Sequence, residues 1–379
     1  MARYQIEYAG AGDRERWDGY VQTHPVASLY QLFGWRDVIE RTYGHRTYYL
    51  MAIRGQANGS AADRVEPGTS SKNIDGILPL AHLKHKIFGN CLVSLPFLDA
   101  GGILADGREA EESLLSEAIR LGREIGATTI DLRHEEPLAT CNDSAASFWS
   151  QDTRGPLNVA TRSDKVRMVL NLPKSSEMLL KSFPSKLRSQ VRKPLKEGFT
   201  SSVGGLELLE DFYKVFLVNM RDLGSPVHSF EFMQNVLTVL RERARIVLVY
   251  KSEEPVAAGM VVGLGNVLRN PWAASLRKYA SLAPNMLLYL RMLEYACESG
   301  YSAFDFGRAT RDEGTYRFKE QWGAVPMPLF WYLISLDGEP LDPEKSGAER
   351  FRWAAHYWRK LPLEVTRILG PRIRKHLSL

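Results

Sequence analysis

One order of elements occurs twice in this chain, and it constrains the fold more than any other feature. In the first copy a strand at residues 92–97 is followed by a turn at 99–102, a helix at 108–125 and a strand at 129–133. In the second copy a strand at 274–279 is followed by a turn at 282–285, a helix at 286–299 and a strand at 303–308. Such self-similarity indicates a tandem repeat.

Each copy also carries a glycine shortly before its last strand. Gly126 precedes Asp131 by five residues, and Gly300 precedes Asp305 by five. Two strands joined by one helix form a βαβ crossover, in which the strands lie side by side and run parallel. The chain is therefore predicted to be an α/β protein with two related domains, each a mixed sheet flanked by helices.

The two copies are separated by residues 141–165, which are rich in Ser, Asp, Asn and Gly and typical of a connection. We place the boundary near Thr161, which gives domains of residues 1–160 and 161–379, and this length suits two domains. Hydrophobic periodicity predicts helices at 13–41, 181–196, 212–220 and 230–240, strands at 47–54, 74–82, 166–172, 245–250 and 257–264, and a hairpin loop at 55–73.

The composition excludes several classes of protein. A net charge of +5 favours anionic ligands but is too small for a dedicated nucleic-acid binder. Cys91, Cys141 and Cys297 offer neither a disulfide framework nor a Cys-x-x-Cys zinc site, and they suit a reducing cytoplasm. No apolar run reaches the roughly 18 residues that span a bilayer. We expect a cytoplasmic protein without a metal site, and peripheral contact with the inner membrane surface stays open.

The strand at 303–308 leads into the candidate site. Gly307 permits a turn or a close backbone approach near the end of this strand. The polar loop and short helix that follow bring further cations, and four basic residues can converge there: Arg308, Arg311, Arg317 and Lys319. Such a cluster can bind phosphate or carboxylate oxygens. The alternative is a solvated basic helix face.

A second basic segment covers residues 181–196, in which Pro184 suits a helix start and Pro194 should end or kink the helix. Arg188 and Arg192 are four residues apart and share a helical face, so they can bind phosphates of a nucleotide, a lipid carrier or RNA. A solvated helix is the alternative. The tail at 351–379 mixes aromatic and basic residues, which suits either an anionic membrane surface or packing against the second domain.

Familiar catalytic motifs are missing from the sequence: it has no phosphate loop, no Gly-x-Ser-x-Gly elbow and no His-Glu-x-x-His. Acylation of an amine needs mainly positioning, a proton acceptor and an oxyanion donor. This reaction therefore suits a site that binds anions and has neither a metal nor a covalent nucleophile. Asp305 is a candidate proton acceptor, although an aspartate in a strand is equally often a hydrogen-bonded structural residue.

These features resemble the FemAB-like branch of the GNAT acyltransferases over nearly the whole chain. The resemblance rests on the tandem unit and on two segments, Lys186-Leu-Arg188-Ser-Gln-Val-Arg192-Lys193 with Gly198, and Phe304-Asp-Phe-Gly-Arg308 followed by Tyr316-Arg-Phe-Lys319-Glu-Gln-Trp-Gly323. Within that branch the chain is most similar to FemAB-related proteins associated with bacterial PEP-CTERM and exosortase systems, which lie near exopolysaccharide genes.

The resemblance implies tandem GNAT-like domains, the second with a basic C-terminal tail, and a transferase that acylates or aminoacylates an amine of a peptidoglycan- or exopolysaccharide-related precursor. The expected catalytic residues are Asp305 and Tyr316, and the expected substrate-binding residues are Arg308, Lys319, Arg188, Arg192, Gly307 and Trp322. No tightly bound cofactor is expected. The co-substrate is acyl-CoA or aminoacyl-tRNA: residues 281–288 lack a glycine-rich CoA turn, and a helical hairpin arm for tRNA has no obvious counterpart.

The implied partners are a phosphate-bearing glycan or lipid-linked precursor, with tRNA as a further candidate. Two other functions stay open. One is a non-catalytic protein that binds a glycan carrier during exopolysaccharide assembly, which predicts ligand binding without donor turnover. The other is RNA binding through residues 181–196, which predicts steep salt dependence.

Overall fold

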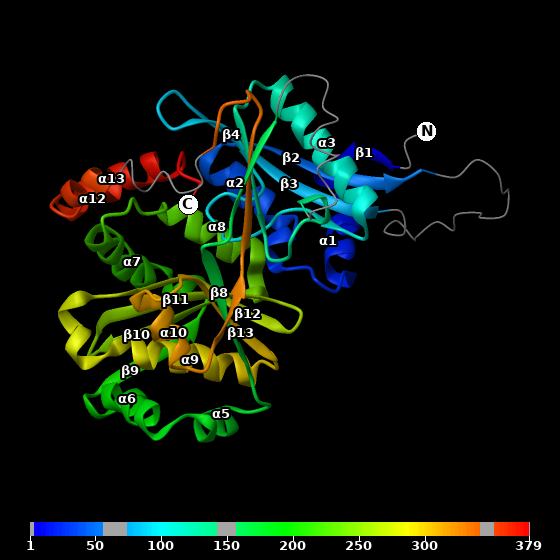
Figure 1. Ribbon diagram of the computed structural model, residues 1–379. Helices are drawn as coiled ribbons and strands as arrows, with labels where there is room; N and C mark the ends of the chain where they lie inside the picture. The colour runs from blue at the N-terminus through cyan, green and yellow to red at the C-terminus, as the bar shows by residue number, and fades with distance from the viewer. Residues whose placement is uncertain (1–3, 56–73, 142–156, 342–351, 379) are drawn as a thin grey trace. The chain divides into compact units, whose positions relative to one another are not determined.

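A computed structural model describes residues 4–55, 74–141, 157–341 and 352–378 (Figure 1). The chain forms two compact units. The first unit comprises Met1–Ser163, Leu329–Glu344 and His376–Leu379, and the second comprises Asp164–Pro328 and Lys345–Lys375. Within the range 161–379, residues 161–163, 329–344 and 376–379 thus belong to the first unit, because β7 (Asn158–Arg162), a later strand and the chain end form hydrogen bonds there.

The first unit is built on one mixed sheet of order β1-β2-β3-β4-β6-β15-β7, with β5 paired to β3. Its strands are β1 (Tyr4–Tyr8), β2 (Arg46–Arg54), β3 (Ile74–His85), β4 (Gly89–Val93), β5 (Leu104–Ala105), β6 (Thr129–His134), β7 (Asn158–Arg162) and β15 (Phe330–Ser335). Only β4 and β6 pair in parallel among these described strands, and α3 (Arg108–Glu124) joins them. This confirms the first βαβ copy.

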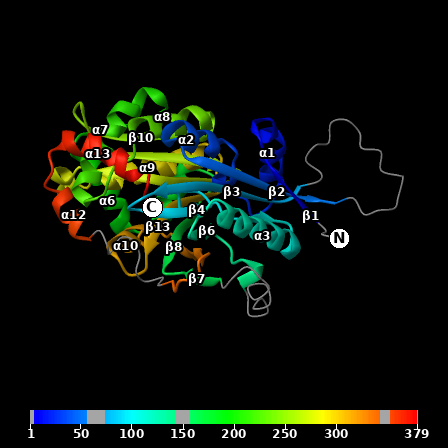
Figure 2. The same ribbon diagram turned by 90° about the horizontal axis from the view of Figure 1, so that it is seen from above.

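The two faces of this sheet follow from the alternation of side chains along a strand. In β2, Tyr48 and Leu50 are buried in a core that α3 shares. Tyr49 lies on the opposite face, where its ring centroid is 4.8 Å from that of Trp17 and 5.2 Å from that of Phe33. These rings belong to the segment of α1 (Arg14–Thr23) and α2 (Gly34–Tyr43), and α3 runs alongside the strands (Figure 2).

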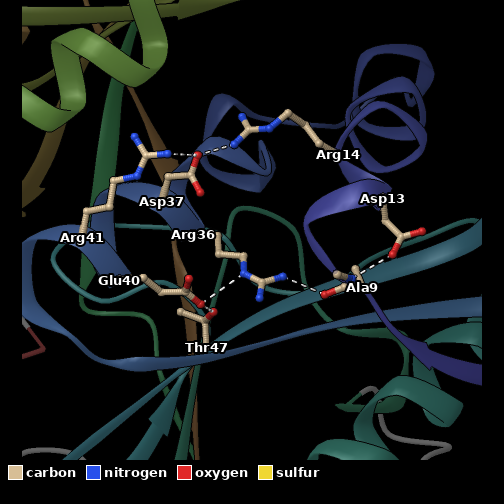
Figure 3. A network of polar contacts seen from close by, with 9 residues as sticks. Ala9, Asp13, Arg14, Arg36, Asp37, Glu40, Arg41 and Thr47 are labelled. Atoms are coloured by element: carbon tan, nitrogen blue, oxygen red, sulfur yellow. Dashed lines mark hydrogen bonds and ion pairs between the residues drawn. The ribbon is translucent and has the colours of Figure 1, made fainter.

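A network of ion pairs fixes α1 and α2 to their surroundings (Figure 3). The carboxylate of Asp37 in α2 accepts a hydrogen bond from Arg14 of α1. It also pairs with Arg41, at 3.4 Å. Arg36 donates to Glu40 at 3.1 Å and to the carbonyl oxygen of Ala9 at 2.8 Å. These charges are therefore paired with one another within the first unit.

The second unit is built on a sheet of order β14-β8-β13-β12-β11-β10-β9. Its strands are β8 (Lys165–Asn171), β9 (Phe199–Gly204), β10 (Ala244–Lys251), β11 (Glu254–Leu264), β12 (Val267–Ser275), β13 (Ala303–Thr310) and β14 (Val325–Pro328). Within this described sheet only β12 and β13 pair in parallel, and α9 (Pro284–Glu298) joins them. The second βαβ copy is therefore also confirmed.

Helices cover both faces of this sheet. Besides α9, the described helices of the second unit are α5 (Ser176–Ser182), α6 (Ser185–Lys196), α7 (Leu209–Leu223), α8 (Phe230–Leu240), α10 (Gly314–Glu320), α12 (Arg352–Trp358) and α13 (Leu363–Arg374). Val247 and Val249 of β10 pack in a core with α9, α5 and α6. Ile246 and Leu248 alternate with them and face the other side, which α7 and α8 cover.

Several predicted boundaries were wrong for identifiable reasons. The strand expected at 274–279 is β12 (Val267–Ser275), and a 3₁₀ helix, Arg277–Leu282, follows it. Arg269, Asn270 and Pro271 made the true strand look unlike one. The strand expected at 92–97 ends at Val93, and Phe97 has a φ of 75°. Helix 13–41 is interrupted between α1 and α2.

The basic helix expected at 181–196 is two helices, because Pro184 holds an extended backbone with φ −56° and ψ 152° between α5 and α6. Pro194 lies inside α6, which ends at Lys196. By contrast, α8 has the predicted bounds. Most of the hairpin loop at 55–73 and of the connection at 141–165 lies outside the described residues.

Candidate active site

The parallel strands β12 and β13 open away from each other beyond their first three residue pairs. They pair from Val267 with Ala303 to Arg269 with Asp305. Beyond that point β12 stays paired to β11 through Trp272 to Ser275, and β13 stays paired to β8 through Arg308 to Thr310. Each strand thus keeps its outer neighbour and loses the other, which leaves an opening at the carboxyl ends of the parallel pair.

Irregularities in both strands produce this opening. In β12, Asn270 and Pro271 oppose the single residue Val261, and the Asn270 side chain donates to the carbonyl oxygens of Met260 and Trp272, both at 2.9 Å. This arrangement is a β-bulge, which bends a strand and interrupts its ladder.

In β13 the register against β8 shifts between Asp305 and Arg308. Gly307 lies inside the shift with a φ of 75°, and a Cβ atom there would lie 2.9 Å from the carbonyl oxygen of Asn270. Gly307 therefore provides the turn and the close approach expected of it.

One buried carboxylate ties together the three strands around the opening. Asp305 is 2% exposed, and its Oδ2 lies 2.9 Å from Nη1 of Arg269 in β12 and 3.5 Å from Nη1 of Arg167 in β8. Its Oδ1 accepts from the backbone N–H of Gly307 at 2.8 Å. We call these four residues the Asp305 cluster.

Alternation explains why the cluster's side chains meet. Leu268, Phe304 and Met168 all belong to the core that α9 covers. Their chain neighbours, which are Arg269, Asp305 and Arg167, therefore point to the opposite face of the sheet. Three neighbouring strands thus place two guanidinium groups and one carboxylate on the same face.

Lys319 binds the backbone of the opened strand. It is buried in α10, and its Nζ donates to the carbonyl oxygens of Gly307 at 3.0 Å and Arg308 at 2.7 Å. These bonds dock α10 onto the shifted part of β13. Arg308 is half-buried, whereas Arg311 and Arg317 are exposed, so the structure shows no basic cluster formed by all four of these described cations.

The remaining predicted residues lie in different surroundings. Trp322 is buried among aromatic rings, with the centroid of Phe183 at 5.6 Å and that of Tyr289 at 6.3 Å, so it packs in the core. Tyr316 is half-buried against the same core, one helical turn before Lys319. The substrate role of Trp322 and the catalytic role of Tyr316 stay predictions.

The two arginines of α6 differ from each other. Arg188 donates from Nη1 to the carbonyl oxygen of Phe183 at 2.9 Å and so caps the end of α5. Arg192 is exposed, and Lys193 beside it donates to the carbonyl oxygen of Ser281 at 2.7 Å, just before α9. Among the described residues, no recorded contact links Arg188 or Arg192 to the Asp305 cluster.

Sequence reasoning missed Arg167 and Arg269, although a charged residue between apolar neighbours in a buried strand is a usable signal. Arg167 lies between Val166 and Met168. Arg269 was missed because its strand was placed several residues too late in the chain.

The first unit has the same strand arrangement, but its opening is filled. Arg133 is 1% exposed and pairs with Asp131 at 2.7 Å, and its Nη1 donates to the carbonyl oxygens of Leu98 at 2.8 Å and Ser378 at 3.2 Å. The backbone N–H of Gly102 donates to the carbonyl oxygen of Arg133 at 2.7 Å. The chain itself therefore occupies the place where the second unit is open.

His134 lies beside this filled opening. A Cβ atom on Gly102 would lie 2.4 Å from its Nε2, so only glycine fits at that position. Burial lowers the pKa of His134 to about 3. Its Nε2 has no hydrogen-bond partner among the described residues.

Two properties of the described chain bear on the class of site. Among the described residues, no three His, Cys, Asp or Glu side chains gather as a metal would require. Within the same residues, every helix is too short or too polar to cross a bilayer.

Comparison with known proteins identifies relatives of both units. Residues 182–320 match a family model described as an acetyltransferase (GNAT) domain. A lipid II:glycine glycyltransferase of Staphylococcus epidermidis is 20% identical over 383 aligned positions, covering 81% of this chain and 87% of that protein. A UDP-N-acetylmuramoylpentapeptide-lysine N(6)-alanyltransferase of Weissella viridescens is 24% identical over 194 positions, covering 49% of this chain and 56% of that protein.

The crystal structure of FemX has a similar fold. It superposes with a TM-score of 0.63 at 16% identity, and the match covers 86% of this chain and 96% of the FemX chain. A tandem GNAT protein from the clavulanic acid biosynthesis pathway superposes with a TM-score of 0.53 at 13% identity, and the match covers 89% of this chain and all of that chain. Together with the two βαβ sheets, these likenesses confirm the tandem GNAT-like fold.

Proposed function

We propose that this chain, which is similar to FemAB-like acyltransferases of the GNAT superfamily, transfers an aminoacyl or acyl group to an amine of a phosphate-bearing cell-envelope glycan precursor. A lipid-linked or nucleotide-linked peptidoglycan precursor is the first acceptor to consider, since the two relatives are named for such molecules. A related exopolysaccharide precursor, and with it the PEP-CTERM and exosortase association, remains a prediction.

The proposed donor is an activated amino acid, with aminoacyl-tRNA first and acyl-CoA second. The names of both relatives specify transfer of an amino acid, glycine or alanine. In this chain α9 begins at Pro284 after a segment without glycine, so it lacks the flexible turn that lets a backbone wrap around a pyrophosphate.

The opening between β12 and β13 is the observation that carries the proposal. The acceptor amine attacks the ester carbonyl there, the new C–N bond forms, and the C–O bond to the donor breaks. Peptide N–H groups on the inner edge of β12 stabilise the oxyanion, because the β-bulge and the lost partner strand free that edge. The hydroxyl of Tyr316 takes the proton that leaves the amine and gives its own proton to the oxygen of the departing donor.

The charged residues take distinct parts in this proposal. Arg308 binds the phosphate of the acceptor, and Lys319 holds the backbone that carries Arg308. Asp305 acts as a positioning residue, because three donors already use its two oxygens. Arg192 is exposed, and its neighbour Lys193 donates to the carbonyl oxygen of Ser281 before α9, so Arg192 is assigned to donor phosphates.

The test offers the purified protein a panel of aminoacyl-tRNAs and acyl-CoAs with lipid-linked and UDP-linked muramoyl-pentapeptide acceptors, and detects transfer by mass spectrometry. Arg308→Ala should raise KM for the acceptor about 10- to 100-fold, the range expected for a charge-assisted hydrogen bond. Arg311→Ala removes an exposed arginine three residues away and should leave KM unchanged.

Further variants separate positioning from proton transfer. Tyr316→Phe should lower kcat while KM stays unchanged. Asp305→Asn should lower kcat and raise KM together, because both arginines of the cluster lose their anchor. Acceptor binding without product from any donor would refute the proposed transfer.

A further inference from the structure

The hairpin between β3 and β4 projects beyond the strands on either side of it (Figure 1). Pairing of β2 with β3 ends at His82, and pairing of β6 with β4 begins at Cys91. Residues 83–90 therefore form a two-stranded ribbon that no other described strand extends. We call residues 83–90 the β3–β4 ribbon.

The turn of the β3–β4 ribbon is held in one conformation. The backbone N–H groups of Ile87 and Phe88 donate to Nδ1 of His85 at 3.1 and 3.4 Å. The Phe88 ring contacts the rings of His85 and His376, with centroids 5.0 and 6.0 Å apart. Because Phe88 packs inward, Ile87 alone points outward, and it is the most exposed large hydrophobic residue of the described chain at 78%.

Two lysines precede this isoleucine in the ribbon. Lys84 and Lys86 are exposed, and neither forms an ion pair with a described residue. Together with His85 and Asn90 they line a cavity of about 560 Å³. Among the described residues, no acidic side chain lines this cavity, and no member of the Asp305 cluster does. The ribbon therefore combines an exposed aliphatic tip with a positively charged hollow.

We propose that the β3–β4 ribbon docks the protein on an anionic phospholipid surface. Ile87 enters the boundary between headgroups and acyl chains, while Lys84 and Lys86 bind lipid phosphates in the cavity between them. The pattern does not favour RNA, because an aliphatic side chain offers no ring on which a base can stack. It does not favour a purely apolar protein partner, because two desolvated ammonium groups would then lack counter-charges.

This docking goes beyond the proposed function and does not depend on it. A protein held at the bilayer meets lipid-linked acceptors in two dimensions, whereas a UDP-linked acceptor needs no membrane. Vesicle binding is measured without any donor, so failure of the transfer reaction leaves it intact. Conversely, ribbon variants should transfer to a UDP-linked acceptor at the rate of the unmodified protein.

The experiment is co-sedimentation of the full-length protein with vesicles of phosphatidylcholine containing about a third phosphatidylglycerol, against phosphatidylcholine alone. The expected result is binding to the anionic vesicles that weakens as salt rises. Lys84→Gln with Lys86→Gln should weaken binding about 25-fold, since each lysine near an anionic surface contributes about fivefold. Ile87→Ser should weaken it several-fold at low and high salt alike.

The control is Lys174→Gln with Lys214→Gln, which removes the same charge from exposed positions of the second unit. Equal binding by the ribbon and control variants would overturn the proposal. So would loss of binding only in Ile368→Ser with Leu369→Ser, which would place the contact on α13. Weaker tRNA binding by the ribbon variants with unchanged vesicle binding would assign the ribbon to RNA instead.

Discussion

Gly307 lies where two backbones approach most closely at the candidate site. Its φ of 75° lies in the left-handed region, and the space for a side chain is taken by the carbonyl oxygen of Asn270. That carbonyl belongs to the β-bulge of β12, so a side chain at Gly307 would push on both irregular strands at once. The opening thus depends on one residue having no Cβ atom.

Gly307→Ala should lower the free energy of unfolding by about 1–3 kcal/mol, from the strained backbone and the 2.9 Å contact together. Urea denaturation measures the loss. Gly314→Ala is the matched control, because Gly314 begins α10 and a Cβ atom there would have no described atom within 4 Å. Equal stability of both variants would contradict the role given to Gly307.

Stability should also fall in acid because of His134. Its folded-state pKa of about 3 lies below the usual 6.5, so the unfolded chain binds a proton that the folded chain does not. The free energy of unfolding should therefore drop as pH falls from about 6.5 towards 3, by up to about 1.4 kcal/mol per pH unit. Buried His228, whose pKa burial also lowers, adds to the slope.

His134→Leu should make this pH dependence shallower, as shown by urea denaturation at several pH values. At neutral pH the substitution should change the free energy of unfolding little, because it removes a buried nitrogen that has no described partner. His356→Leu, at an exposed position of α12, should keep the full slope. An unchanged slope in His134→Leu would refute the assignment.

At the scale of elements, α13 docks closely through a glycine and a buried arginine. Gly370 lies against Val227, where a Cβ atom would meet Cγ1 at 2.8 Å and the backbone nitrogen at 3.1 Å. One turn later, Arg374 donates from Nε to Nε2 of the buried His228 at 3.0 Å. The C-terminal tail therefore packs on the second unit through α13, one of the two alternatives that its sequence left open.

Gly370→Leu should release α13, because a larger side chain has no room at this contact. The free energy of unfolding should fall by about 1–3 kcal/mol. Hydrogen exchange should then speed up in the amides of α13 and not in α9. Ile368→Ala changes an exposed residue two positions earlier and should leave exchange as it was. Protected α13 amides in Gly370→Leu would show that the helix docks by other contacts.

Elements with regular periodicity could be predicted from the sequence, and irregular ones could not. α8 and α9 follow a helical pattern with clear ends. β12 combines a bulge, Pro271 and a buried arginine, each of which is rare in a central strand, so its position was misjudged. The same error left Arg269 out of the predicted site, because Arg269 lies in that strand.

The sequence also could not show which partner each basic side chain binds. Lys319 and Arg188 were expected to bind phosphate, and both donate to backbone carbonyl oxygens in the structure. Sequence shows that a cation is present but not which oxygen satisfies it. Trp322 was likewise indistinguishable in sequence from a core aromatic.

At the scale of the whole molecule, the path of the chain links the two units covalently more than once. The first sheet takes β7 from before the second unit and β15 from after it, and β15 lies between β6 and β7. No single continuous segment confined to the first unit therefore contains all the described strands of its sheet. This arrangement makes the unit depend on residues distant in sequence.

A fragment of residues 1–163 should fail to fold, because without β15 both β6 and β7 lose a neighbour in the sheet. Circular dichroism should show no cooperative urea transition. Joining residues 329–344 to this fragment through a Gly/Ser linker should restore the transition. Cooperative unfolding of residues 1–163 alone would show that β15 is dispensable.

The placement of β15 also sets an order of events during synthesis. A ribosome that has released β7 must still make β8 to β14 before β15 (Phe330–Ser335) emerges. At typical elongation rates this takes on the order of ten to thirty seconds. Throughout that interval β6 and β7 lack the strand that pairs with both of them, so the first sheet cannot be completed until translation is nearly finished.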